Sequence, residues 1–177
     1  MDYCLEYELL NDENHVFKNI SYDELMDFFE GFKTGLIMIG GYWCKNCQAI
    51  IDLLNNIAKK SGIDCVYNYD PKFINVYGDE EDLRDCKSLE IKLKYYKLIE
   101  SLGYKSDTLV VDTLIPRISV PFIFAVKNGT CVGYYEKELL RDGVLLYKQG
   151  EKEDYTLDFV HEITMLIEKI NQKDRLM

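Results

Sequence analysis

The stretch GYWCKNC, residues 41–47, places Cys44 and Cys47 with two residues between them, directly behind Trp43, the single tryptophan of the chain. Two thiols at this spacing suit a dithiol–disulfide couple, half of a metal site, or two core cysteines that happen to be close. A structural zinc site commonly takes about four Cys or His ligands. The chain has no second Cys-x-x-Cys pair, and its two histidines lie far apart in the sequence. We therefore expect no bound metal, and no cofactor other than a redox-active Cys44–Cys47 disulfide.

The sequence around the pair places it between a strand and a helix. The apolar run Leu36–Ile39 is bounded by Gly35 and by Gly40–Gly41, which is typical of a strand buried on both faces of a sheet. Residues 49–62 predict an amphipathic helix, and residues 63–70 predict a further strand. The two cysteines therefore lie at the first corner of a βαβ unit.

This corner makes the two thiols unequal. A free cysteine, with a pKa of about 8.5, is mostly protonated at neutral pH, and the thiolate is the nucleophile. Cys44 would lie at the helix N-terminus, where unpaired N–H groups stabilise negative charge, and Lys45 adds a cation. Cys47 lies one turn further in and would be more buried. We expect Cys44 to attack a substrate disulfide and Cys47 to resolve the mixed disulfide, with Lys45 and Asn46 modulating both.

The remaining patterns predict a single α/β domain over residues 1–177, with a central mixed sheet flanked by helices. Ser21 and Glu24 have the spacing of a capping box. Residues 78–103 carry the longest helical pattern, whose inner stripe is predicted to be Leu83, Cys86, Leu89, Leu93, Tyr96 and Ile99. The other expected elements are a strand at 15–20, a helix at 21–32, a connector at 107–119, a hairpin at 122–135, a short strand or ordered loop at 143–150 and a closing helix at 154–173.

Pro121 stands at the start of the apolar strand in SVPFIF, residues 119–124. A trans proline here would disrupt the pairing of the strand, although trans prolines are common at strand entries. A cis Val120–Pro121 bond would instead turn the backbone of Val120 outward. That backbone could then hold an extended substrate peptide against Cys44.

Together these motifs resemble the thioredoxin superfamily. The resemblance rests on GYWCKNC (41–47), YNYDPK (67–72) and VPFIFAVKNG (120–129), and covers roughly residues 15–135 and the last helix. It implies a thioredoxin-like fold whose active site consists of Trp43, Cys44, Cys47 and a cis-proline loop at Pro121, with Val120 and Trp43 contacting the substrate.

Three features depart from that pattern. Lys45–Asn46 stands where reducing thioredoxins typically have Gly-Pro, and Met38 stands where they usually have a buried aspartate that assists proton transfer to the second cysteine. The segment before Pro121 is also enlarged, by an insert of about residues 78–115 containing a long helix. This insert either covers the active site, docks a partner or simply extends the core.

The resemblance implies a thiol–disulfide oxidoreductase that reduces protein or peptide disulfides, with a thioredoxin-reductase-like electron donor. A glutaredoxin-like enzyme is an alternative, in which Lys45 and Arg117 would hold the carboxylates of glutathione. A second alternative is a thioredoxin-fold accessory protein, like those associated with bacteriocin production, whose insert binds a partner.

The charge of the chain argues against polyanionic partners. It has 21 basic and 31 acidic residues, a net charge of −10, so its mean field repels nucleic acid and anionic membranes. The acidic N-terminus does not resemble a secretory signal, and no apolar stretch is long enough to cross a bilayer. We therefore expect a cytoplasmic protein that binds neither nucleic acid nor membrane.

Overall fold

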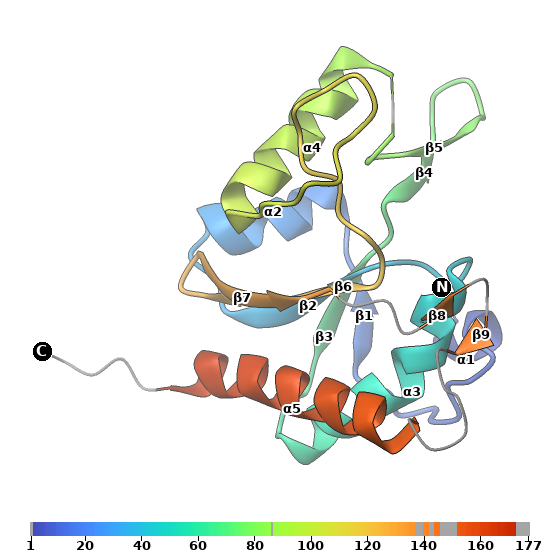
Figure 1. Ribbon diagram of the computed structural model, residues 1–177, viewed down its shortest axis with the longest axis vertical. Helices are drawn as coiled ribbons and strands as arrows, with labels where there is room; N and C mark the ends of the chain where they lie inside the picture. Colours follow the sequence, from blue (N-terminus) through green and yellow to red (C-terminus); the bar gives the residue numbers. More distant parts are fainter. Residues whose placement is uncertain (1, 86, 137–139, 142–143, 146–151, 173–177) are drawn as a thin grey trace, which may run out of the picture.

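The structure is a computed structural model that describes residues 2–85, 87–136, 140–141, 144–145 and 152–172. Its centre is a mixed five-stranded sheet in the order β1-β3-β2-β6-β7 (Figure 1). The strands are β1 (Phe17–Asn19), β2 (Gly35–Ile39), β3 (Val66–Tyr69), β6 (Phe122–Lys127) and β7 (Thr130–Tyr135). β1, β3 and β2 run parallel, whereas β6 is antiparallel to both β2 and β7. The predicted mixed α/β architecture is confirmed.

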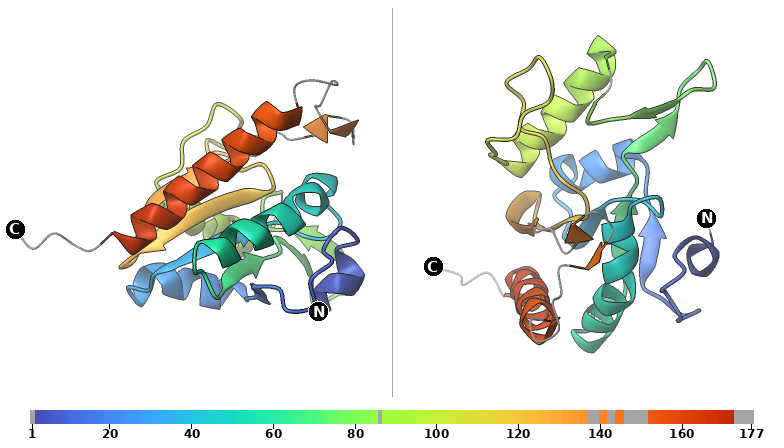
Figure 2. Two further views of the ribbon diagram at one scale, coloured as in Figure 1. Left: turned by 90° about the horizontal axis from the view of Figure 1, so that it is seen from below. Right: turned by 45° about the vertical axis from the view of Figure 1, so that its right-hand side comes forward.

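Helices cover both faces of this sheet. α3 (Lys45–Lys60) and α5 (Lys152–Asn171) pack on one face, and α2 (Tyr22–Glu30) and α4 (Leu89–Leu102) lie on the other (Figures 1 and 2). A short helix that the sequence did not predict, α1 (Tyr3–Glu6), lies at the N-terminus. None of these described helices is both long and apolar enough to traverse a lipid bilayer.

The apolar run in β2 divides the core into two halves. Leu36 and Met38 point into the cluster beneath α3 and α5, and Ile37 and Ile39 point into the cluster beneath α2 and α4. All four side chains are fully buried, as expected for a strand in the middle of a sheet with helices on both faces. Burial of one such side chain contributes about 1.5–3 kcal/mol to stability.

The sequence signals for α2 and α3 are confirmed. The Ser21 hydroxyl accepts a hydrogen bond from the Glu24 amide, and the Glu24 carboxylate accepts one from the Ser21 amide, which completes the capping box. α3 begins at the dithiol, with Cys44 as its N-cap residue. The hairpin of β6 and β7 turns at Asn128 and Gly129, both of which have positive φ.

The long helix expected over residues 78–103 is only partly present. α4 begins at Leu89, whereas β5 (Glu80–Asp82) pairs antiparallel with β4 (Lys72–Ile74). The cause is the turn between these strands. The Asn75 side chain accepts hydrogen bonds from the amides of Tyr77 and Asp79, and Gly78 adopts a φ of +88°. This turn chemistry overrides the helical pattern of the acidic residues that follow.

The buried face of α4 also differs from the expected one. Leu89, Leu93 and Tyr96, predicted to lie on the inner stripe, are exposed. The residues that α4 buries are Tyr95, Leu98, Ile99 and Leu102. They follow the i, i+3, i+4, i+7 spacing of a second stripe that shares only Ile99 with the predicted one, so the helix is rotated relative to the prediction.

The last predicted elements are largely present. The closing helix is α5. β9 (Val144–Leu145) lies within the segment 143–150, predicted to hold a short strand or ordered loop, and pairs with β8 (Leu140–Arg141), which precedes that segment. Residues 143 and 146–150 of the predicted segment lie outside the described residues.

Candidate active site

The corner between β2 and α3 is built on two glycines. A Cβ atom on Gly40 would collide with the Sγ of Cys47, and one on Gly41 would collide with the Trp43 indole nitrogen and the Asp70 carboxylate. The absence of side chains at these positions therefore lets Cys47, Trp43 and Asp70 approach the end of β2.

Cys44 occupies the N-cap position, where its Sγ accepts a hydrogen bond from the Cys47 amide at 3.4 Å. Its pKa is lowered to about 7, first by a hydrogen bond from the Cys47 thiol and then by the amides of Cys47 and Asn46 and the positive charge of Arg84. These contributions outweigh the burial that raises the pKa. Cys44 is also partly exposed, so a thiolate formed near neutral pH is accessible to a substrate.

Cys47 has the opposite character. Its side chain is 0% exposed, and burial, followed by its interaction with Cys44, raises its pKa well above the ordinary value. The negative charge of Asp70 raises this pKa further. Met38 is buried in the same core cluster as Cys47, so this position supplies no acid or base for the resolving step.

The loop before β6 faces this pair. The Val120–Pro121 peptide bond is cis, and the Cys44 Sγ lies 3.6 Å from the Val120 carbonyl oxygen. Four residues predicted for the site are thus brought together: Cys44, Cys47, Val120 and Pro121. Beside them is a polar cavity of about 290 Å³ lined by Asn46, Arg84, Arg117, Ser119, Val120, Pro121 and Glu136.

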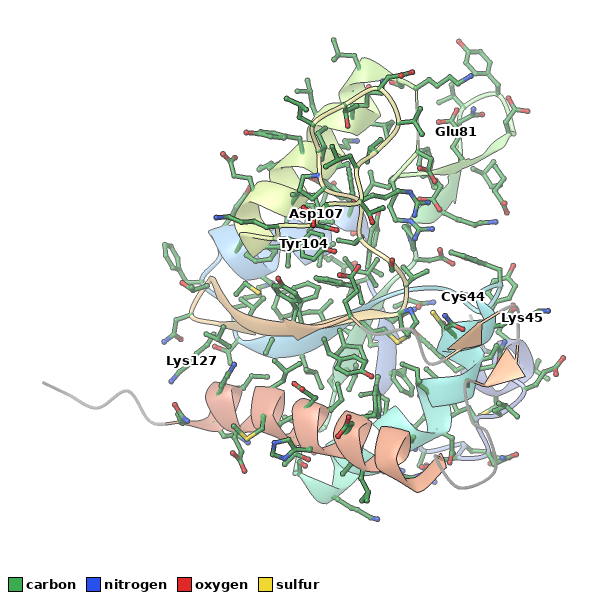
Figure 3. The ribbon with its side chains drawn as sticks, in the orientation of Figure 1. Cys44, Lys45, Glu81, Tyr104, Asp107 and Lys127 are labelled. Carbon is green, nitrogen blue, oxygen red and sulfur yellow. The ribbon has the colours of Figure 1, made fainter. Side chains whose placement is uncertain are left out.

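Lys45, by contrast, is exposed at the start of α3 and points toward the edge of the molecule (Figure 3). Among the described residues, no hydrogen bond or ion pair joins the Lys45 side chain to Cys44 or Cys47, and the groups that act most on the Cys44 thiolate are Cys47, Asn46 and Arg84. Arg117, the other cation expected for glutathione, binds the Asp85 carboxylate through two hydrogen bonds of 2.8 and 2.5 Å. Asp85 therefore already neutralises much of the charge expected to hold glutathione.

The Trp43 indole contacts one carboxylate through its nitrogen and two cations over its ring. Its indole N–H donates to both carboxylate oxygens of Asp70, at 3.0 and 3.1 Å. The Lys72 ammonium lies 4.7 Å from the ring centroid and the Arg84 guanidinium 5.7 Å, both within cation–π range. These contacts fix the indole beside Cys44, and burial raises the pKa of Asp70.

Sequence reasoning missed Asp70 and Arg84 as site residues. A signal for Asp70 existed, because it follows β3 directly and the carboxyl ends of parallel β2 and β3 meet at one edge of the sheet. Arg84 had no such signal. It is 94% buried, it forms a two-bond pair with Asp82, and it reaches the site only because β4 and β5 turn the chain back. Among the residues described, no three His, Cys, Asp or Glu side chains are grouped to hold a metal ion.

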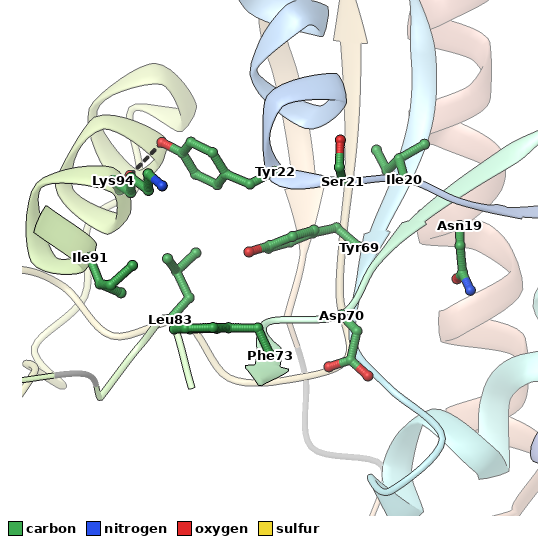
Figure 4. A pocket seen from close by; sticks show the side chains of 10 residues that line it. All are labelled: Asn19, Ile20, Ser21, Tyr22, Tyr69, Asp70, Phe73, Leu83, Ile91 and Lys94. Carbon is green, nitrogen blue, oxygen red and sulfur yellow. Dashed lines mark hydrogen bonds between the residues drawn. The ribbon is translucent and has the colours of Figure 1, made fainter. Parts of the chain in front are cut away.

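A second cavity, mostly apolar and about 370 Å³ in volume, lies between the sheet edge and the insert (Figure 4). Tyr22, Tyr69, Phe73, Leu83 and Ile91 form most of its wall. Asp70 lines it as well, so this cavity and Trp43 share one side chain. The cavity contains neither cysteine and is separate from the polar one beside Pro121.

With the dithiol at the first turn of α3 and the proline loop facing it, the mixed sheet has the arrangement of a thioredoxin-like fold. No family model matches the sequence, and no curated protein matches it.

Solved structures of the same fold class do resemble the chain. One is a proposed oxidoreductase with a thioredoxin fold, at 13% identity and a TM-score of 0.42, covering 82% of this chain and 94% of that one. Thioredoxin O2 from Arabidopsis thaliana matches at 15% identity and a TM-score of 0.38, covering 70% and 84%. Thioredoxin F from spinach chloroplast matches at 15% and 0.40, covering 85% and 95%. At such values the fold assignment rests on the topology and the site described above.

Proposed function

We propose that this protein is a thiol–disulfide oxidoreductase that reduces protein or peptide disulfides through Cys44 and Cys47. The observation that carries the proposal is the asymmetry of the pair. Cys44 is partly exposed with a pKa of about 7, whereas Cys47 is fully buried with a raised pKa. An exposed thiolate beside a buried thiol suits an attacking and a resolving cysteine.

The reaction proceeds in two exchanges. The Cys44 thiolate attacks one sulfur of a substrate disulfide, forming a mixed disulfide and releasing the other substrate sulfur as a thiolate, which takes up a proton. Cys47 then loses its proton and attacks the Cys44 sulfur, which releases the second substrate thiolate and leaves a Cys44–Cys47 disulfide. The substrate gains two electrons, and a dithiol donor of the thioredoxin-reductase type returns two electrons to the protein.

The loop of Val120 and Pro121 supports the binding step. The Val120 carbonyl oxygen lies beside the Cys44 sulfur, where backbone groups of an extended substrate strand could pair with it. The adjoining polar cavity provides room for a side chain next to the substrate cysteine.

A redox titration tests the proposal. Trp43 is the single tryptophan and lies directly before Cys44, so its emission reports the state of the pair. We expect one reversible two-electron transition between about −200 and −300 mV, the range of glutaredoxins and thioredoxins. A Cys44→Ser variant serves as the control and should show no transition; a wild-type protein without one would refute the proposal.

A binding function is the second candidate, because the insert and its neighbours expose large apolar side chains. Val76, Tyr77, Leu89 and Leu114 are each more than 70% exposed. Such side chains are typical of partner surfaces when they lie close together. A double variant, Cys44→Ser with Cys47→Ser, separates the two functions. Its biological activity should be lost if the protein acts by disulfide exchange and kept if the protein acts by binding a partner.

A further inference from the structure

The segment that leads into Pro121, residues 116–119, lies outside the strands and helices and is held by distant side chains. Tyr95, on the buried face of α4, donates its hydroxyl hydrogen to the Pro116 carbonyl at 3.0 Å. The same hydroxyl accepts a hydrogen bond from the Ile118 amide at 2.9 Å. The Arg84 guanidinium donates to the Ile118 carbonyl at 3.4 Å. The insert thus satisfies both backbone groups of Ile118.

The flanking residues are fixed as well. Arg117 forms its two hydrogen bonds with Asp85, and the Arg117 amide donates to the Thr108 carbonyl at 2.8 Å. The Ser119 amide donates to the Glu136 carboxylate at 2.5 Å, and that carboxylate also accepts a hydrogen bond from the Tyr104 hydroxyl. Tyr104 lies between α4 and the sheet (Figure 3).

These contacts matter because residues 116–119 belong to no strand, and Pro116 has only an isolated antiparallel bridge to Leu109. Loop segments with few buried contacts open more readily than the elements they connect. Ile118 is 1% exposed and packs in the core cluster beneath α2 and α4, so its backbone groups are shielded from water and need protein partners. Tyr95, itself 1% exposed, forms two hydrogen bonds with this segment, one to Pro116 and one to Ile118. Arg84 forms a third, to the Ile118 carbonyl.

We propose that Tyr95 is a positioning residue for substrate binding, which holds residues 116–118 so that Val120 stays beside the Cys44 sulfur. This inference rests on the proposed disulfide exchange, since it assigns a role within the same site. The insert then acts as a part of the active site, because its helix fixes the loop against which the substrate lies.

The test compares two variants that each remove one phenolic hydroxyl contacting the insert. Tyr95→Phe removes both hydrogen bonds to the loop. Tyr22→Phe, the matched control, removes a hydrogen bond of 2.7 Å to the Lys94 carbonyl, which joins α2 to α4 without touching residues 116–119. Both variants are assayed for the reduction of insulin disulfides, with dithiothreitol as the electron source.

For Tyr95→Phe we expect KM for insulin to rise about three- to tenfold while kcat stays within about twofold, which corresponds to one or two lost hydrogen bonds. Tyr22→Phe should leave both constants unchanged. A merely structural role would lower the active fraction, and therefore kcat, at constant KM. That result, or an unchanged KM in Tyr95→Phe, would overturn the inference.

Amide hydrogen exchange gives a second readout that does not depend on turnover. The Ile118 amide should exchange faster in Tyr95→Phe and at the wild-type rate in Tyr22→Phe, and equal rates in all three proteins would contradict the inference. A wild-type protein that fails to reduce insulin would refute the proposed function. The Ile118 exchange rate would then still decide whether Tyr95 holds the loop.

Discussion

The two sides of the candidate site are held by contacts of different range. On one side, the corner of residues 40–47 is formed by a buried strand, two glycines and the first turn of α3, all consecutive in the chain. On the other side, residues 116–119 form hydrogen bonds with side chains 17 to 34 positions away. The reactive sulfur therefore depends on local structure, whereas the surface that faces it depends on how the insert packs. Changes to the corner should alter chemistry, and changes to the insert should alter substrate binding.

The largest effect is expected at the cysteines. Cys44→Ser should reduce kcat/KM for insulin by about 1,000-fold or more, because the attacking thiolate is lost. Cys47→Ser should instead accumulate a mixed disulfide between Cys44 and the substrate, since the resolving thiol is missing. Mass spectrometry of the unreduced protein measures this adduct.

Cys65→Ser is the matched control for these variants. Cys65 is partly exposed, but burial raises its pKa and it lies away from the corner. The variant should keep the wild-type rate and trap no substrate. Equal losses of activity in Cys44→Ser, Cys47→Ser and Cys65→Ser would show that the two cysteines of the corner have no special role in the reaction.

The next effect is on the anchoring of Trp43. Asp70→Ala leaves the indole N–H without its carboxylate acceptor, and we expect the free energy of unfolding to fall by about 1–3 kcal/mol, together with a change in Trp43 emission. Asp70→Asn keeps an acceptor oxygen and should lose less. Urea unfolding measures both, and an equal loss in the two variants would contradict the assigned hydrogen bond.

The smallest expected effect is electrostatic, and it is the effect of Arg84, in the insert, on the pKa of Cys44 at the corner. Replacing Arg84 and Asp82 together, as Arg84→Gln with Asp82→Asn, removes the cation near Cys44 without leaving its partner charge unpaired. Because a positive charge favours the thiolate, its loss should raise the pKa of Cys44 by a fraction of a pH unit.

The second arginine–aspartate pair of the insert provides the control. Arg117→Gln with Asp85→Asn removes a similar but more exposed pair, whose charges are not among the largest contributions to the pKa of Cys44. The pH dependence of Cys44 alkylation should shift only in the first double variant. A shift of the same size in both double variants would show that Arg84 has no specific effect on the pKa of Cys44.

The same difference in range explains how much could be predicted from the sequence. The corner was predictable because Leu36–Ile39, the glycine pair and the helical pattern after Cys47 lie within one stretch of chain. The cis bond at Pro121 was expected only through the resemblance to thioredoxins, since statistics alone favour trans.

The insert was the least predictable region. The hairpin at its start depends on the side chain of Asn75 and on Gly78. Helical periodicity is read from apolar residues, so it gives no weight to these two positions. The contacts of Arg84 and Tyr95 with residues 116–118 join positions whose neighbouring sequence does not indicate that they meet. Such pairings are settled by tertiary packing, which single-sequence patterns do not encode.

Alkylation of the reduced protein with iodoacetamide over a range of pH, with the modified thiols identified by mass spectrometry, tests the central claim most directly. Because only the thiolate reacts, we predict that Cys44 modification rises with pH, reaches half its maximum near the pKa of about 7, and leaves Cys47 unmodified in the folded protein. A Cys44 midpoint at the value of an ordinary thiol, about 8.5, or equally fast modification of Cys47, would contradict the account.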